Sequence, residues 1–227
     1  MLLGLLLLLQ TPSFADSEKT TGDNENLEVS VKASSISSKH YERISKSIVE
    51  VGRENSYGYG TGTIFIKNKQ TFVLTVAHVV SGIDEAVIRY ENSETVGKVV
   101  YYDEDSDIAV ISVPPIPGRD PVESRFRKKD LTMGEETMYC GYPNKKELAC
   151  FSGNISLVSE SVINIHSYAW MGASGSAVID KKGRIVGVLS AVEVGMAWGL
   201  PQIIEDIVWV KPINSKFFDA LDKGFSK

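Results

Sequence analysis

Short apolar runs separated by turn residues extend through most of the chain. They alternate apolar with polar positions or are rich in β-branched and aromatic side chains, which is typical of β-strands. Glycine, proline and Asn/Asp clusters separate the runs, and no helical pattern intervenes between them. The predicted strands are 44–51, 62–66, 71–76, 85–90, 97–102, 108–113, 136–142, 151–158, 161–167, 176–180 and 184–192. Their number and spacing favour an all-β fold of two small barrels over a βαβ fold.

A segment rich in proline and charge, 115–130, divides the predicted strands into two groups. It is the expected connection between the barrels. We therefore expect the first barrel over about 44–114 and the second over about 131–211, followed by a helix over 212–224.

The C-terminal helix is the one segment with a helical pattern. Its spacing places Phe217 and Leu221 on the same face. Asn214 or Ser215 would cap its start, and Gly224 would end it, because glycine readily adopts the left-handed conformation that closes many helices.

The first fifteen residues have the pattern of a signal peptide. Residues 2–9 are apolar but too few to span a bilayer, and the small Ser13 and Ala15 follow where a signal peptidase cleaves. The usual Lys or Arg before the apolar run is missing. We expect removal of 1–15 and export to the periplasm or the medium, with no stable membrane insertion afterwards. The polar segment 16–40 cannot bury enough apolar surface to offset its ordering entropy and is expected to be a flexible leader.

Composition adds limits on size and partners. The chain has 227 residues, 43% of them hydrophobic, and can bury one substantial core or two small ones. Its 24 Lys and Arg residues against 29 Asp and Glu residues give a formal net charge of -5. The longest basic cluster, 125–129, ends at Asp130 and is expected to be a solvated loop. We expect no nucleic-acid partner, no metal and no cofactor.

The two cysteines, Cys140 and Cys150, flank a turn-like segment that contains Gly141, Pro143 and Asn144. Such a turn would place the cysteines opposite each other across a hairpin, where they would form a disulfide in an oxidising compartment. The alternative is two unrelated buried thiols, because a bridge also requires the two strand positions to match in register and face.

Three short motifs supply the groups needed for nucleophilic catalysis. T-V-A-H ends at His78, D-I-A-V begins at Asp107, and G-A-S-G-S has Ser174 at its centre. A serine hydroxyl is a poor nucleophile at neutral pH and needs a neighbouring base, and the imidazole base needs a carboxylate to orient it. The order His, Asp, Ser is informative because other folds that build this triad place its members in different orders.

His78 is the candidate base among the three histidines. His40 lies in the polar leader and His166 falls in an alternating strand pattern, whereas His78 follows an apolar strand where a loop begins. A histidine at such a strand end can equally be a packed core residue. The other two motifs favour the catalytic interpretation.

Asp107 is the candidate carboxylate within an acidic run. Asp103, Glu104 and Asp105 are expected in a solvated turn. Asp107 directly precedes an apolar strand, so its side chain is the one most drawn toward buried surface.

These motifs resemble those of the chymotrypsin-like (trypsin-like) serine proteases, especially the compact bacterial Deg/HtrA type. The resemblance implies two six-stranded Greek-key β-barrels, with His78 and Asp107 in the first and Ser174 in the second. It implies that the backbone N–H groups of Gly172 and Ser174 bind the developing oxyanion. The implied function is that of a serine endopeptidase that cleaves polypeptide substrates through an acyl-enzyme.

The resemblance also points to residues that hold the substrate. Ser190, Ala191 and Val192 open the segment on which family members pair the substrate as an added strand. Counting six residues back from the nucleophile places Tyr168 at the base of the primary pocket, and Val192 falls on its wall. A pocket of this kind would be shallow and apolar, so we expect cleavage after small aliphatic residues. His166 is the rival, because it would favour Glu if its ring turned into the pocket.

Two departures from the family limit what the resemblance implies. Trypsin-like zymogens carry Asp directly before the nucleophile, where it pairs with a newly cut amino terminus, but Ala173 stands there in this chain. The Deg type usually adds a PDZ domain, whereas only the predicted helix follows Lys211. We therefore expect a protease domain over 41–227 without a PDZ domain, and infer neither regulation nor oligomeric state.

Other functions stay open at this point. A catalytically silent member of the fold would act as a peptide-binding module, although such a protein has no need to keep all three triad residue types. Triad chemistry also serves esterases and other acyl hydrolases. A purely structural β protein is the simplest alternative.

Overall fold

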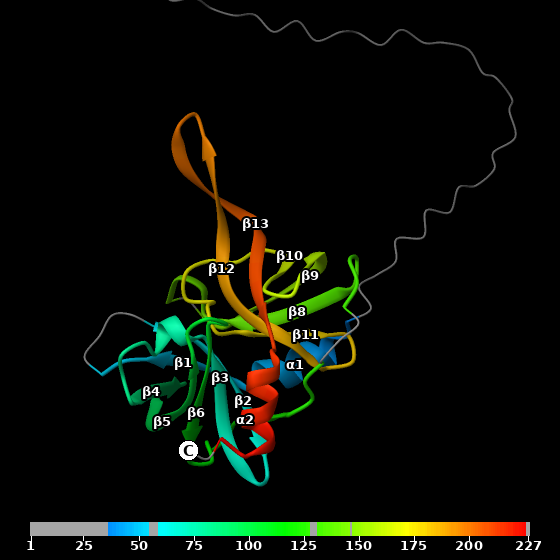
Figure 1. Cartoon of the computed structure of the whole chain (residues 1–227). Helices are drawn as coiled ribbons and strands as arrows, with labels where there is room; N and C mark the ends of the chain where they lie inside the picture. Colours follow the sequence, from blue (N-terminus) through cyan, green and yellow to red (C-terminus); the bar gives the residue numbers. More distant parts are fainter. Residues whose placement is uncertain (1–35, 55–58, 128–130, 146, 226–227) are drawn as a thin grey trace, which may run out of the picture. The chain divides into compact units, whose positions relative to one another are not determined.

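The computed structural model describes residues 36–54, 59–127, 131–145 and 147–225 (Figure 1). The predicted signal peptide lies outside the described residues, as does all but the end of the predicted leader. Two antiparallel barrels make up most of the described chain, which confirms the predicted all-β fold. No helix in the described part is long and apolar enough to cross a membrane.

Six antiparallel strands close the first barrel. Their spatial order is β1-β4-β5-β6-β3-β2, and β2 pairs back onto β1. The strands are β1 (Ile48–Gly52), β2 (Tyr59–Lys67), β3 (Gln70–Thr75), β4 (Glu85–Tyr90), β5 (Ser93–Asp103) and β6 (Ile108–Val113). Their inward-facing valine and isoleucine side chains fill the barrel. A short strand from the expected linker, β7 (Val122–Glu123), adds to the edge of β2 in parallel.

The second barrel closes in the order β10-β13-β12-β11-β8-β9. Its strands are β8 (Glu136–Gly141), β9 (Ala149–Val158), β10 (Ile163–His166), β11 (Ala177–Asp180), β12 (Ile185–Ala197) and β13 (Leu200–Pro212). The sequence analysis did not predict β13 or the outer part of β12. Two prolines and an acidic pair interrupt that stretch, so no clear strand pattern is visible in it.

A short helix precedes the first strand and corrects two expectations. Helix α1 (Ser38–Ser45) begins inside the segment expected to be a flexible leader, and it includes Ile44, which was expected to open an extended strand. Strand β1 begins only at Ile48. Ile44 is the one buried residue of the helix, so the sequence carries no helical repeat of apolar positions there.

The C-terminal helix matches its prediction. Helix α2 (Ser215–Asp222) is capped by Asn214, whose side-chain oxygen accepts the backbone N–H of Phe217 at 2.8 Å. Phe217 and Leu221 are both buried. The chain turns at Gly224, which has a φ of +71°.

Aromatic rings join α2 to the first barrel. Phe217 packs on Phe126 with ring centroids 5.0 Å apart, and Phe126 packs on Phe65 of β2 at 5.6 Å. Phe225 lies 5.2 Å from Phe72 of β3. These contacts bury one face of the helix and the linker phenylalanine together.

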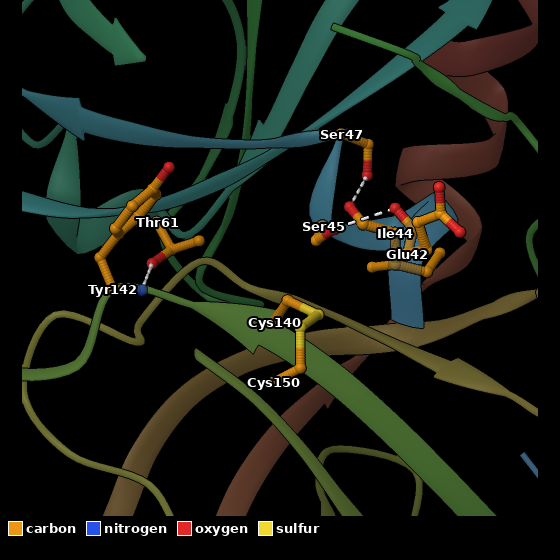
Figure 2. The surroundings of a disulfide bond; sticks show 8 residues. All are labelled: Glu42, Ile44, Ser45, Ser47, Thr61, Cys140, Tyr142 and Cys150. Atoms are coloured by element: carbon orange, nitrogen blue, oxygen red, sulfur yellow. Dashed lines mark hydrogen bonds between the residues drawn. A yellow bond between two sulfur atoms is a disulfide. The ribbon is translucent and has the colours of Figure 1, made fainter. Parts of the chain in front are cut away.

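The two cysteines form the predicted disulfide. Cys140 and Cys150 are direct partners in the β8–β9 ladder, with Cα atoms 4.0 Å apart (Figure 2). The turn between these strands holds the 3-10 segment η2 (Pro143–Lys145), in which Asn144 has a φ of +54°. The bridge therefore closes the hairpin below this turn.

A group of ion pairs ties the linker to the second barrel. The Arg127 guanidinium contacts the carboxylate of Glu135 and lies 3.5 Å from that of Asp180, which is 3% exposed and also pairs with Arg184 at 2.6 Å. The hydrogen bond from Arg127 has the largest effect on the pKa of the Glu135 carboxyl and lowers it. Burial raises this pKa, but the bonds from Arg127 and from the N–H and hydroxyl of Thr132 together outweigh burial. These contacts lower the pKa of Glu135 to about 2.

We predict that Glu135→Gln destabilises the protein in a pH-dependent way. Because the folded pKa lies below the unfolded value of about 4.3, ionised Glu135 stabilises the fold above that value. This contribution disappears as the pH falls toward 2. Urea unfolding from pH 7 to pH 2.5 should therefore show a large stability difference at neutral pH that shrinks with acid. Glu160→Gln, at an exposed position, is the control, and a difference that stays constant with pH would contradict the prediction.

Candidate active site

His78 lies at the rim of the first barrel, in the 3-10 turn η1 (Ala77–Val79) that follows β3. Its side chain is 50% exposed. Nδ1 lies 3.0 Å from Oδ2 and 3.1 Å from Oδ1 of Asp107, and the backbone N–H of His78 donates to Oδ1 at 3.0 Å. The carboxylate thus fixes both the ring and the backbone. Because Nδ1 carries the proton that it donates to Asp107, Nε2 of the neutral ring is left as a hydrogen-bond acceptor.

Asp107 is presented from the turn between β5 and β6 with a φ of +51°. Aspartate tolerates this left-handed conformation better than most residues. The other candidates of the acidic run point elsewhere: Asp103 accepts from the amide of Asn214 at 3.1 Å, and Asp105 is 89% exposed. Asp107 is therefore the member of the run that the structure brings to His78.

Asp107 has a second partner from the other barrel. Burial of the Asp107 carboxyl raises its pKa, but hydrogen bonds from the His78 ring, the Ser190 hydroxyl and the His78 backbone N–H together lower it below the usual value. The Ser190 hydroxyl donates to Oδ2 at 2.6 Å. The carboxylate thus stays ionised at neutral pH, ready to stabilise a charged imidazole. The sequence analysis assigned Ser190 only to substrate binding and missed this contact.

Ser174 lies in the glycine-flanked loop between β10 and β11. Its hydroxyl donates to the backbone carbonyl of Ser190 at 3.1 Å. Among the described residues no hydrogen bond joins it to His78. Ser190 therefore binds two members of the site at once, Asp107 through its hydroxyl and Ser174 through its carbonyl.

Thr61 of β2 holds the serine loop from the first barrel. Its backbone N–H donates to the carbonyl of Ser174 at 2.7 Å, and its hydroxyl donates to the carbonyl of Gly172 at 2.7 Å. The same hydroxyl accepts the backbone N–H of Tyr142 at 3.1 Å, beside the disulfide-bonded hairpin (Figure 2). Gly175 is required here, because a Cβ would lie 1.9 Å from the carbonyl oxygen of Thr61.

The backbone around Gly172 is oriented by the β8–β9 turn. The N–H of Asn144 donates to the carbonyl of Met171 at 2.6 Å. Because the peptide bond is planar and trans, the N–H of Gly172 points the opposite way. Neither this N–H nor that of Ser174 has a hydrogen-bond acceptor among the described residues, whereas the N–H of Ala173 is bonded to Trp170. Both predicted oxyanion donors are thus free.

A cavity of about 220 Å³ opens beside the serine and is lined by Trp170, Met171, Ser174, Leu189, Ala191 and Val192. The predicted residues Ala191 and Val192 belong to this lining. Tyr168 does not, which corrects the expectation that it forms the base of the pocket. Its ring lies against Phe151, and its carbonyl accepts the Tyr139 hydroxyl. His166 ends β10 in an exposed position and is not part of the lining either.

The sequence analysis missed two positioning residues, Thr61 and Asn144. The sequence did contain a signal for Thr61, because this residue stands between Gly60 and Gly62. Glycine inside a strand often marks a place where another backbone approaches closely. Asn144 was noted only as a turn residue. Its contact with Met171 joins segments far apart in the chain and leaves no local pattern.

Two closed barrels with a His–Asp pair in one and a glycine-flanked serine in the other define the chymotrypsin-like class of proteins. The trypsin-like peptidase domain matches residues 60–188, more than half of the chain. The chain therefore belongs to the trypsin-like peptidase family.

Several relatives and solved structures are named after HtrA or DegP. A Hahella chejuensis protein named "Probable periplasmic serine endoprotease DegP-like" is 30% identical over 142 residues, or 58% of this chain and 30% of that protein. The Staphylococcus aureus protein named "Serine protease HtrA-like" is 24% identical over 225 residues, or 84% of this chain and 29% of that protein. The chain thus aligns with less than a third of the length of either relative.

Two solved structures share the fold. The active form of the Rv3671c protease from M. tuberculosis superposes with a TM-score of 0.64 at 21% identity, covering 83% of this chain and 85% of that one. The HtrA-type protease AlgW with tripeptide gives a TM-score of 0.66 at 19% identity, covering 82% of this chain and 62% of that one.

We predict that Thr61→Val lowers both stability and the reactivity of Ser174. The change keeps the shape of the side chain but leaves the Gly172 carbonyl and the Tyr142 N–H without their partner, which should cost about 2 kcal/mol of unfolding free energy. The loop should also lose its fixed position, so labelling of Ser174 by a fluorophosphonate should slow. Urea unfolding and labelling kinetics measure the two effects.

Thr63→Val is the matched control, because the buried Thr63 hydroxyl accepts the N–H of Ala177 at 3.1 Å and, among the described residues, makes no hydrogen bond with the loop from Ser167 to Ser176. It should lower stability and leave the labelling rate of the folded protein unchanged. Equal labelling rates in both variants would show that Thr61 has only a structural role.

Proposed function

We propose that the chain is a serine endopeptidase in which His78 is the general base, Asp107 orients it and Ser174 is the nucleophile. The observation that carries the proposal is the bidentate hold of Asp107 on His78 beside a serine loop with two free N–H groups. The names of the relatives, which are serine proteases, support the same reaction class.

The hydrogen bond from Ser174 to the Ser190 carbonyl suggests how substrate starts the reaction. A substrate backbone N–H that binds this carbonyl competes with the Ser174 hydroxyl for the same acceptor. The released hydroxyl can then turn to Nε2 of His78. Substrate binding and activation of the nucleophile are thereby coupled through one oxygen atom.

The chemical steps follow from the groups present. Oγ of Ser174 attacks the scissile carbonyl while its proton passes to Nε2, and the charge on the imidazolium is balanced by Asp107. The N–H groups of Gly172 and Ser174 donate to the oxyanion. The imidazolium then protonates the leaving amine, which leaves an acyl-enzyme. A water molecule activated by Nε2 releases the acid and restores the hydroxyl.

A catalytically silent peptide-binding protein is the second candidate, and the resting hydrogen bond of Ser174 to Ser190 is the observation in its favour. Against it, the free donors of Gly172 and Ser174 have no evident use in a protein that only binds peptides. The experiment on the nucleophile separates the two functions.

We predict that Ser174→Ala or His78→Ala removes about six orders of magnitude of turnover, as in another triad protease, and that Asp107→Ala costs somewhat less. Cleavage of a casein substrate and labelling by a fluorophosphonate probe are the measurements. Asp105→Ala is the control and should keep full activity. No labelling of the native protein would favour the silent peptide-binding module.

We predict that the enzyme cleaves after small aliphatic residues such as Ala and Val. The lining of the pocket contains no charged side chain, and it includes the branched side chains of Leu189 and Val192. A misfit of one methylene-sized step should cost about 1–3 kcal/mol. Profiling with a peptide library tests this, and Val192→Gly should broaden the profile to larger residues. Dominant cleavage by the native protein after Glu, Arg or Phe would contradict the prediction.

We also propose that the protein is exported, to the periplasm or the medium. The disulfide favours an oxidising compartment. Two relatives, from Hahella chejuensis and Haemophilus influenzae, carry the word periplasmic in their names. The first fifteen residues have the pattern of a signal peptide.

A further inference from the structure

The outer part of the β12–β13 hairpin projects beyond the other strands of the second barrel (Figure 1). Val192 pairs with Val208, but the next residue, Glu193, pairs with Ile204. Three residues of β13, 205–207, are therefore inserted between consecutive pairs. This bulge separates the wall of the barrel from residues 193–204, which we call the outer ribbon. The outer ribbon ends in a turn at Trp198 and Gly199.

The outer ribbon is apolar and largely uncovered. The sequence from 194 to 204 contains no charged residue. Directly paired residues share a face of the ribbon, so Val194 with Ile203 and Met196 with Pro201 form one apolar face. All four are exposed, Met196 at 71%. Contiguous exposed apolar surfaces commonly mark binding sites for other molecules.

One edge of β12 is continuous from the nucleophile to the tip of the ribbon. Up to Val188 this edge is paired with β11, and at Leu189 it is bonded to Gly175 and Ser176. Beyond Leu189 no described backbone group pairs with it. Its first open part, from Ser190 to Val192, is the segment on which the resemblance implies that the substrate pairs as an added strand.

A substrate strand on this edge has only one direction in which to extend. Its residue before the scissile bond lies by Ser190, next to the cavity lined by Ala191 and Val192. The edge behind Ser190 is already occupied. The preceding substrate residues must therefore run outward along the ribbon, antiparallel to β12.

We propose that the outer ribbon binds an extended apolar segment of the substrate, N-terminal to the scissile bond, as an added β-strand. This inference rests on the proposed endopeptidase function. In antiparallel register the third residue before the bond lies opposite Val192, the fifth opposite Val194 and the seventh opposite Met196. Substrates with apolar side chains at the fifth and seventh positions are favoured, because these side chains lie on the apolar face.

A lipid surface is a poorer occupant of the ribbon. Both outer edges of a two-stranded ribbon carry unpaired backbone groups, and burying those in hydrocarbon costs several kcal/mol each. Glu193 and Asp206 at the base of the ribbon would also face anionic headgroups. An added peptide strand instead pairs the backbone of one edge.

The test compares three quenched-fluorescence peptides with the same residues around the scissile bond. The short one begins four residues before the bond. The two long ones begin eight residues before it, with Ile or Ser at the fifth and seventh positions. The native protein should cleave the long Ile peptide with a kcat/KM about tenfold above that of the short peptide, and the long Ser peptide with little gain.

Met196→Ser should remove most of the gain, whereas Leu200→Ser should keep it. Leu200 is 63% exposed but lies on the other strand and the opposite face, paired with Ala197. All three proteins should cleave the short peptide equally. Equal cleavage of the long and short peptides by the native protein would overturn the inference, and so would equal loss of the gain in both variants. Failure to cleave any of the peptides, together with no fluorophosphonate labelling, would instead reject the proposed function.

Sedimentation measurements identify the rival occupants. A dimer that Met196→Ser dissociates, with no gain from the long Ile peptide, would assign the ribbon to a second copy. Binding to phosphatidylcholine vesicles that Met196→Ser abolishes, again with no gain, would assign it to a membrane. Either result overturns the proposal.

Discussion

The hold of Thr61 on the serine loop is the interaction on which the site depends. The two barrels are separate hydrogen-bonded sheets, so nothing in either sheet fixes Ser174 relative to His78. The buried Thr61 supplies this link. Its backbone N–H donates to Ser174, and its hydroxyl donates to Gly172 and accepts from Tyr142. Buried polar groups that satisfy one another in this way specify one arrangement of their partners.

Ser190 makes the second link between the barrels. Its hydroxyl reaches Asp107 in the first barrel, while its carbonyl accepts from Ser174 in the second. The Asp107 carboxylate is thus hydrogen-bonded to the strand proposed to receive the substrate. A shift of β12 would therefore disturb the pair of His78 and Asp107 as well as the hydroxyl of Ser174.

The elements predicted from the sequence are those whose cause is local. The strands of the first barrel follow from the periodicity of apolar positions, and the start of α2 follows from the capping residue Asn214. The disulfide-bonded hairpin follows from the turn between Cys140 and Cys150. The candidate triad also lay in short motifs. What the sequence did not reveal depends on contacts between distant segments: the bond from Ser190 to Asp107, the bond from Asn144 and the turn of Tyr168 away from the pocket.

Strand β12 divides along its length into parts with different constraints. From Ile185 to Val188 it pairs with β11, and from Gly187 it also pairs with β13, so this part is a wall of the barrel with its side chains buried in the core. From Leu189 to Val192 it shapes the pocket. Beyond the bulge of β13, neither the core nor the other described strands constrain the ribbon. Substitutions in the outer ribbon should therefore leave Ser174, His78 and Asp107 in place, because no hydrogen bond of the site passes through it, and under the proposal they would change only which polypeptides bind.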